Sequence, residues 1–130
     1  MTDIYLFEDY PLLGKFRFPR SYLELVSEEL PEIDPWFWLA PFKDLSLFWA
    51  NTLREQFPKR HLIPFAKDGG SDDVACFDGR DETGEPKVFL IHSFCDPGYE
   101  FRGETKDFAT WLIQMEKLAA EFKADSQQCE

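Results

Sequence analysis

The residues of this sequence that could do chemistry are few and widely spaced. There are two histidines, His61 and His92, and three cysteines, Cys76, Cys95 and Cys129. No second histidine or cysteine stands at metal-ligand spacing from either histidine, which argues against a structural metal site. An odd number of cysteines without paired spacing argues against a disulfide framework and favours a reducing cytoplasm.

Catalysis by His92 with Cys95 would need both side chains on one side of a strand. Positions i and i+3 of a strand point to opposite faces, which weakens this pairing. By two-residue periodicity His92 shares a face with Val88 and Leu90, where a histidine is more often a hydrogen-bonded core residue than a catalyst. Cys76 is expected to be a buried, inert thiol. We therefore predict no catalytic site, no metal and no cofactor.

The most polar and glycine-rich segment runs from Asp68 to Asp73, DGGSDD. It lacks the lysine and the following helix of a phosphate-binding loop. Its acid spacing is wrong for an EF-hand loop, and no glutamate closes it, although weak calcium binding stays open. Because its glycines can take positive φ, an acidic β-turn is the simplest interpretation.

Negative charge dominates the composition. The chain has 130 residues, with 25 Asp and Glu against 14 Lys and Arg, and a formal net charge of −11. Contact with phosphates needs clustered positive charge, so this balance argues against nucleic acid and an anionic membrane as partners. No stretch reaches the length of a membrane span, and Asp3, Glu8 and Asp9 stand where a signal peptide would be basic. We predict a soluble, cytoplasmic protein.

The excess of acid is concentrated between Asp68 and Glu85, where seven acidic residues accompany one base, Arg80. Most of them fall on two predicted hairpin loops, so we expect them to converge on one rim of a sheet. Such a rim would steer a basic partner, and a solvated loop edge is the alternative. The candidate partner-binding acids are Asp68, Asp72, Asp73, Asp78, Asp81 and Glu82.

Three consecutive aromatic residues form a second cluster, Trp36, Phe37 and Trp38. Strand alternation would place the two tryptophans on one face and Phe37 on the other. Burial against helices is one interpretation. Exposed beside an acidic rim, the tryptophans would instead anchor an interface, so Trp36 and Trp38 join the candidate partner-binding residues.

An α+β fold is predicted to position these residues. The first helix should have Pro19 in its first turn and end at Pro31, and the second should be capped by Asp44 and end at Pro58. The apolar stripe expected on the second helix is Leu45, Phe48, Trp49, Leu53 and Phe57.

The middle of the chain is predicted to form strands at 62–66, 73–78 and 87–94, in an antiparallel meander of at least three strands. A closing helix capped by Thr105 carries an apolar stripe that needs a sheet or helix pair to cover it. Its members are Phe108, Trp111, Leu112, Met115, Leu118, Ala119 and Phe122. We predict one domain over 1–125, an antiparallel-rich sheet packed against N-terminal helices and a C-terminal helix, with a frayed tail at 126–130.

Several segments carry a family resemblance when taken in order. Residues 18–22 (FPRSY) begin a helix at Pro and an aromatic, and residues 62–72 (LIPFAKDGGSD) are an apolar strand with Pro-Phe-Ala before an acidic Gly-rich turn. The later segments that carry the resemblance are two strands, at residues 74–78 and 87–90, and the FxxWL of the closing helix at 108–112. Over about residues 15–120 these segments resemble the SUKH superfamily, the Smi/Knr-like proteins. Residues 30–35 differ from the Asn-Gly-Gly turn that many members carry there.

The resemblance implies a Smi/Knr-like α+β fold and, in bacteria, an immunity protein that neutralises a secreted toxin, often a nuclease or deaminase. Fungal relatives act as scaffolds in cell-wall signalling, and no shared catalytic residues are implied. The leading hypothesis is therefore a non-enzymatic immunity protein whose carboxylates occupy the groove of a basic toxin domain. The alternatives are a regulatory or scaffold module for an endogenous partner, and a small hydrolase or metal-dependent enzyme using His92 or the aspartate loop. The oligomeric state is left open.

Overall fold

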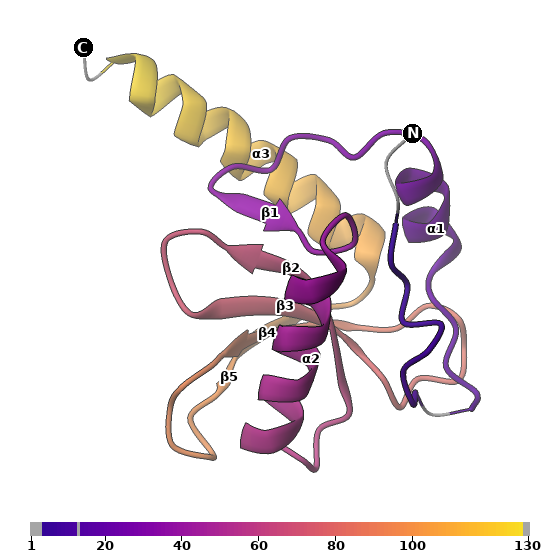
Figure 1. Ribbon diagram of the computed structural model, residues 1–130. Coiled ribbons are helices and arrows are strands. Elements are labelled where there is room, and N and C mark those ends of the chain that lie inside the picture. The colour runs from indigo at the N-terminus through magenta and orange to yellow at the C-terminus, as the bar shows by residue number, and fades with distance from the viewer. Residues whose placement is uncertain (1–3, 13, 129–130) are drawn as a thin grey trace.

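A five-stranded antiparallel sheet with the strand order β1-β2-β3-β4-β5 forms the centre of the protein (Figure 1). The structure is a computed structural model that describes residues 4–12 and 14–128. Its strands are β1 (Trp36–Trp38), β2 (Leu62–Asp68), β3 (Asp73–Asp78), β4 (Val88–His92) and β5 (Phe101–Thr105). Its helices are α1 (Arg20–Ser27), α2 (Lys43–Gln56) and α3 (Phe108–Gln128). The predicted α+β fold with a meander sheet is confirmed.

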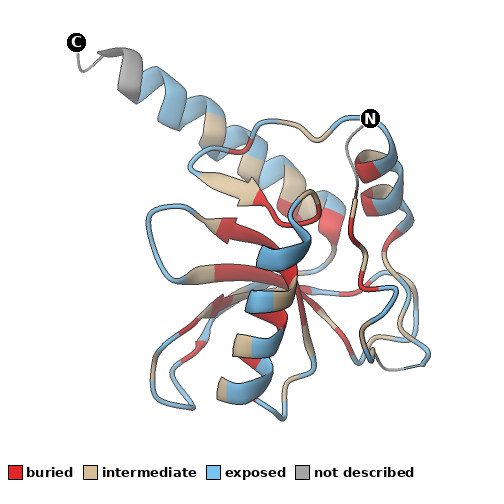
Figure 2. Cartoon of the chain, in the orientation of Figure 1, coloured by how far each residue is buried: buried red, intermediate tan, exposed pale blue. Residues whose placement is uncertain are grey.

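Helices cover both faces of the sheet, α2 on one side and α1 with α3 on the other, as Figure 1 shows. The core under α1 and α3 includes Tyr22, Phe65, Phe77, Phe108 and Trp111, and the core under α2 includes Leu39, Trp49, Leu53, Val74, Cys76 and Ile91. Strand β3 supplies both cores, because successive side chains of a strand point to opposite faces. Its central position explains why buried residues follow the middle strands in Figure 2.

The two outer strands, β1 and β5, were not predicted. In β1, Trp36 lies opposite Asp68 and Trp38 lies opposite Ala66, within a segment that three prolines interrupt. β5 contains Gly103 at a φ of 149°, and its pairing with β4 shifts register between Leu90 and Ile91. Both strands lie at the edges of the sheet and are ordered by pairing with β2 and β4, and neither has the longer apolar run that located the middle strands.

Three expected helix starts differ from the structure. Pro19 stands just before α1 rather than in its first turn, and Phe42 precedes α2, so Asp44 lies inside that helix instead of capping it. Thr105 is the last residue of β5, and Asp107 caps α3 because its Oδ1 accepts a hydrogen bond of 2.8 Å from the backbone N–H of Thr110. Hydrogen bonds from Thr110 hold the pKa of Asp107 below its usual value.

The helix ends and faces are partly as expected. Helix α1 stops at Ser27, before Pro31, and α2 stops at Gln56, just ahead of Pro58. On α2 the predicted stripe is wrong for Leu45 and Phe48, which are exposed, because the helix turns Trp49 and its next-turn neighbour Leu53 toward the sheet instead. Helix α3 continues through residues 126–128, where a frayed tail was expected, and Cys129 lies outside the described residues.

No helix in the described ranges is both long enough and apolar enough to span a membrane.

Candidate functional site

The six acidic candidates do not form one rim. Those of the β2–β3 turn are Asp68, Asp72 and Asp73, and those at the β3–β4 loop are Asp78, Asp81 and Glu82. Successive loops of a meander lie at opposite ends of the strand they share, and Figure 1 shows the two loops on opposite sides of the sheet. The length of β3 separates them by about 17 Å. The expected convergence is therefore wrong, because the acids fall on consecutive loops.

At the β3–β4 loop, the acidic side chains mostly hold their own loop in shape. An oxygen of Asp78 accepts a hydrogen bond of 3.0 Å from the N–H of Arg80, and Asp81 accepts bonds of 3.0 and 2.9 Å from the N–H and hydroxyl of Thr83. Glu82 is exposed. These contacts stabilise the turn, and two of its acids have a cationic neighbour, since Arg80 lies 3.5 Å from Asp78 and Lys15 lies 3.9 Å from Glu82.

The β2–β3 turn is organised by a lysine that the sequence analysis missed. Lys67 is buried, its ammonium donates hydrogen bonds to the carbonyl oxygens of Asp68, at 2.6 Å, and Ser71, and it lies 5.1 Å from the ring centroid of Trp49. The carboxylate of Asp68 accepts bonds of 3.0 and 2.9 Å from the N–H of Gly70 and the hydroxyl of Ser71. The position of Lys67 in an otherwise apolar strand could have indicated from the sequence that its ammonium binds the following turn.

One of the two glycines of this turn is required for space, and neither is required for positive φ. Neither Gly69 nor Gly70 takes a positive φ. Gly69 donates its N–H to the carbonyl oxygen of Pro35 at 2.9 Å, and a Cβ on Gly69 would lie 2.7 Å from that same oxygen. The nearest atom to a Cβ on Gly70 is a carboxylate oxygen at 3.8 Å. The turn therefore depends on glycine at one of the two positions.

We expect Gly69→Ala to lower the free energy of unfolding by about 1–3 kcal/mol, because the added methyl group would push away the backbone of Pro35. The neighbouring substitution Gly70→Ala should change it by less than about 1 kcal/mol. Urea denaturation followed by circular dichroism measures both. Equal effects of the two substitutions would contradict the claim that Gly69 is needed because the backbone of Pro35 lies so close to it.

His92 forms a pair with Asp73, and its Nδ1 lies 2.8 Å from Oδ1 of that residue. The two residues are opposite each other on β4 and β3, so the contact joins the ends of these strands. The thiol of Cys95 is directed at the carbonyl oxygen of His92, at 3.2 Å, rather than at the imidazole. Cys76 is fully buried, and burial raises the pKa of its thiol well above the usual value. Within the described residues, no three His, Cys, Asp or Glu side chains gather as a metal site.

The two candidate tryptophans lie on one face of β1, and Phe37 packs into the core under α2, so the predicted alternation is confirmed. Trp38 is buried, and its Nε1 donates a hydrogen bond of 2.8 Å to the carbonyl oxygen of Pro31. Trp36 is half-buried, with its ring centroid 6.3 Å from that of Trp111. Trp38 is therefore a core residue and not an exposed anchor.

A different apolar group reaches the surface, and we call it the aromatic surface: the exposed side chains of Leu45, Phe48 and Phe94 around the buried ring of Trp49. Phe48 is 51% exposed and Phe94 is 59% exposed. Their rings contact Trp49 edge-on, with centroid separations of 5.1 and 5.9 Å. The backbone N–H of Phe94 donates to Oε1 of Gln56 at 2.7 Å, which fixes the loop after β4 against α2.

The aromatic surface adjoins the acidic β2–β3 turn. The backbone N–H and the hydroxyl of Ser93 both donate to the carbonyl oxygen of Asp72, at 2.9 and 2.7 Å, and Lys67 links the same turn to Trp49. This contact arises because alternate loops of a meander share one end of the sheet, as the β2–β3 and β4–β5 loops do in Figure 1. The sequence analysis missed this surface because it assigned Leu45 and Phe48 to the core.

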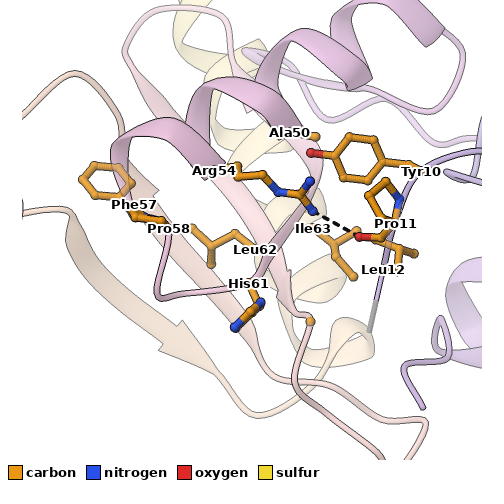
Figure 3. A pocket seen from close by; sticks show the side chains of 11 residues that line it. Tyr10, Pro11, Leu12, Ala50, Arg54, Phe57, Pro58, His61, Leu62 and Ile63 are labelled. Carbon is orange, nitrogen blue, oxygen red and sulfur yellow. Dashed lines mark hydrogen bonds between the residues drawn. The ribbon is translucent and has the colours of Figure 1, made fainter. Parts of the chain in front are cut away.

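A hollow of about 510 Å³ lies on another side of α2, against the N-terminal segment (Figure 3). Arg54 donates a hydrogen bond of 3.1 Å to the carbonyl oxygen of Pro11 and lies 4.7 Å from the ring centroid of Tyr10. Its guanidinium is thus engaged in attaching the N-terminal segment to α2. His61 is exposed at the edge of this hollow.

Comparisons with models of protein families, with curated proteins and with solved structures find no match to this chain. Function is therefore inferred from the surface of this chain and from the resemblance of its sequence segments.

Proposed function

We propose that this protein is a non-enzymatic, cytoplasmic immunity protein that binds and neutralises a cognate bacterial toxin with a basic surface. The observation that carries the proposal is the aromatic surface beside the acidic β2–β3 turn. Exposed aromatic anchors next to negative charge match the composition of an interface that selects a basic partner. The resemblance of residues 62–72 to the SUKH superfamily supports the same function, since that stretch ends in this turn.

The aromatic surface is held in place before any partner binds. Phe48 and Phe94 both pack on Trp49, whose ring is in turn packed in the core and contacted by Lys67. Side chains that are already ordered lose less conformational entropy on association. The anchors can thus contribute apolar contact area at a low entropic cost.

Fewer acidic residues remain candidates for the interface than the sequence analysis named. Asp68 and Asp72 remain candidates because their turn adjoins the aromatic surface, and Asp73 lies beside them, paired with His92. The acids at the β3–β4 loop are at the other end of β3 and are left out of the proposal. Carboxylates on the turn would occupy phosphate positions of a nuclease groove and would speed the encounter at low salt.

The direct test is co-expression with the toxin encoded beside this protein. We expect the wild type to protect the cells that express the toxin. Continued killing of cells that contain folded, abundant immunity protein would contradict the proposal. With the purified toxin domain, Phe48→Asp and Phe94→Asp should each weaken binding by about tenfold to a hundredfold. Leu23→Asp, at an exposed apolar position of α1, is the matched control and should bind as the wild type does.

A charge-reversal pair tests the steering by the acidic turn. Asp72→Lys should slow association with the toxin domain and flatten its dependence on salt, because it reverses a charge next to the interface. Glu82→Lys makes the same change at the opposite end of β3 and should have a smaller effect. Stopped-flow association rates at several salt concentrations measure both. An equal reduction by the two variants would contradict the placement of the interface.

A further inference from the structure

The hollow between α2 and the N-terminal segment combines an apolar lining with a positively charged side chain (Figure 3). Its volume of about 510 Å³ is typical of small-molecule sites, which are mostly apolar and contain a few convergent polar groups. The buried residues that line it come from three places in the fold: Ala50 of α2, Ile63 of β2 and Gly79 just after β3. The hollow is therefore built by segments that are far apart in the sequence.

The charge of this lining is opposite to that of the chain as a whole. The chain has a formal net charge of −11, but none of the residues that line the hollow is acidic. Arg54 and His61 are the two lining residues that can carry a positive charge. Within the described residues, no carboxylate forms an ion pair with Arg54. A cation without a carboxylate partner in such an acidic chain is suited to an anionic ligand.

Arg54 is held in place and still has N–H groups to offer. Its Nη2 donates a hydrogen bond of 3.1 Å to the carbonyl oxygen of Pro11, and its guanidinium lies 4.7 Å from the ring centroid of Tyr10. This is the one hydrogen bond of the Arg54 side chain among the described residues, whereas a guanidinium has five N–H donors. A planar group of donors that is already fixed can bind a carboxylate through two parallel hydrogen bonds at a low entropic cost.

His61 stands at the edge of the same hollow in an uncommon backbone conformation. Its φ of 52° lies in the left-handed region, which residues other than glycine seldom adopt. Its carbonyl oxygen accepts a hydrogen bond of 2.8 Å from the N–H of Gly79, and a Cβ on Gly79 would collide with that oxygen. This close contact fixes the backbone of His61. Residues in such conformations concentrate at ligand-binding sites, so His61 is a candidate second donor to the anion.

We propose that this hollow binds a small monocarboxylate whose carboxylate group pairs with Arg54 and whose apolar body lies on the apolar lining. One guanidinium with one imidazole nearby suits the single charge of a carboxylate, whereas a phosphate group has more oxygens to satisfy. Ala50 and Arg54 are one turn apart and share a side of α2 that does not include Phe48. The site is therefore separate from the aromatic surface, and the two proposals are tested independently.

Nuclear magnetic resonance titration of the isotope-labelled protein tests the ligand chemistry with two probes, phenylacetate and hexanoate. We expect at least one of them to give saturable shifts at backbone amides that line the hollow, with a dissociation constant of about 1 mM or lower. The corresponding neutral amides, phenylacetamide and hexanamide, should bind at least about tenfold more weakly, because they lack the charge that faces Arg54. Acetate and inorganic phosphate, which lack the apolar body, should also bind more weakly.

Three outcomes of this titration would overturn the proposal. Absence of saturation by both probes up to about 10 mM would remove the site itself. Equal binding of a carboxylate and its neutral amide would rule out recognition of the charge. Equal binding of the probes and of acetate or inorganic phosphate would show a general anion site and rule out the role of the apolar lining.

Substitution of the arginine tests its role. Arg54→Gln should raise the dissociation constant of the tighter probe by at least about tenfold, and Arg54→Lys, which keeps the charge without the planar donors, should raise it by less. Lys59→Gln is the matched control, because it removes an exposed cation that is close in sequence and does not line the hollow. The amide spectrum of each variant without ligand verifies that it is folded. Unchanged affinity in Arg54→Gln, or an equal loss in Lys59→Gln, would also overturn the proposal.

Discussion

Replacing Phe77 with alanine is expected to lower the free energy of unfolding by about 3–5 kcal/mol. The side chain is fully buried on β3 and stacks on Phe65, with ring centroids 4.2 Å apart. The Phe77 ring also contacts Tyr22 edge-on, at a centroid distance of 5.1 Å, and Phe108 at 5.9 Å, so it joins α1 and α3 to the sheet. Alanine would leave a cavity that these rings, held by one another, can fill only in part. Urea denaturation monitored by circular dichroism gives the change directly.

Phe48→Ala provides the matched control for this measurement. The same atoms are removed, but Phe48 is half exposed on α2, so we expect a loss of less than about 1 kcal/mol. Similar losses for the two variants would contradict the assignment of Phe77 to the core and Phe48 to the surface. The pair also separates stability from the proposed function, since under that proposal Phe48→Ala would weaken binding of the partner while the protein stays folded.

Replacing Glu100 with glutamine is expected to cost about 2–3 kcal/mol at neutral pH. Glu100 is buried just before β5, and Arg60 Nε lies 2.5 Å from its Oε2. Its other oxygen accepts a hydrogen bond of 2.6 Å from the N–H of Gly98, within the β4–β5 loop. Glutamine keeps the shape of the side chain, but it removes the charge that faces Arg60 and replaces one of the two accepting oxygens with an NH2 group that cannot accept a hydrogen bond. Thermal or urea unfolding at neutral pH measures the loss.

The effect of this substitution should depend on pH. Burial raises the pKa of Glu100, but hydrogen bonds from its own backbone N–H, from Arg60 and from Gly98 outweigh this, and the pKa lies below its usual value. A carboxyl group with a lowered pKa in the folded state stabilises the protein above its pKa in the unfolded chain. That stabilisation is lost as the pH falls through the folded-state pKa. The difference in stability between wild type and Glu100→Gln should therefore shrink in acid.

The control for this pH dependence is Glu104→Gln on β5. Glu104 pairs with Lys87 at 2.9 Å, and both side chains are about half exposed, so the loss should be under about 1 kcal/mol. Urea midpoints measured from neutral pH into the acid range would show the comparison. A difference between wild type and Glu100→Gln that stays constant across that range would contradict the role of the ionised carboxylate.

Parts of the fold follow from local patterns. The strand 73–78 was predicted with the bounds that β3 has, because Val74, Cys76 and their neighbours form an apolar run between acidic turns. Prolines located the end of α2 for an equally local reason, since proline cannot continue a helix. Strands β1 and β5 were not predicted, because their residues become strands by pairing with β2 and β4. Asp107, rather than Thr105, caps α3, because Thr105 is the last residue of β5 and pairs with β4.

The candidate site shows the same division. The composition and order of the residues were enough to predict an acidic α+β protein and to place its acids on hairpin loops. Which loops share an end of the sheet depends on strand order, so tertiary structure separated Asp78 from Asp72 and brought Phe94 beside the acidic turn. Burial was decided at the same level, because a side chain such as Trp38 or Phe48 is covered only when residues far along the chain pack against it. Contacts between distant segments, which no local pattern contains, therefore define the surface of this protein that can meet a partner.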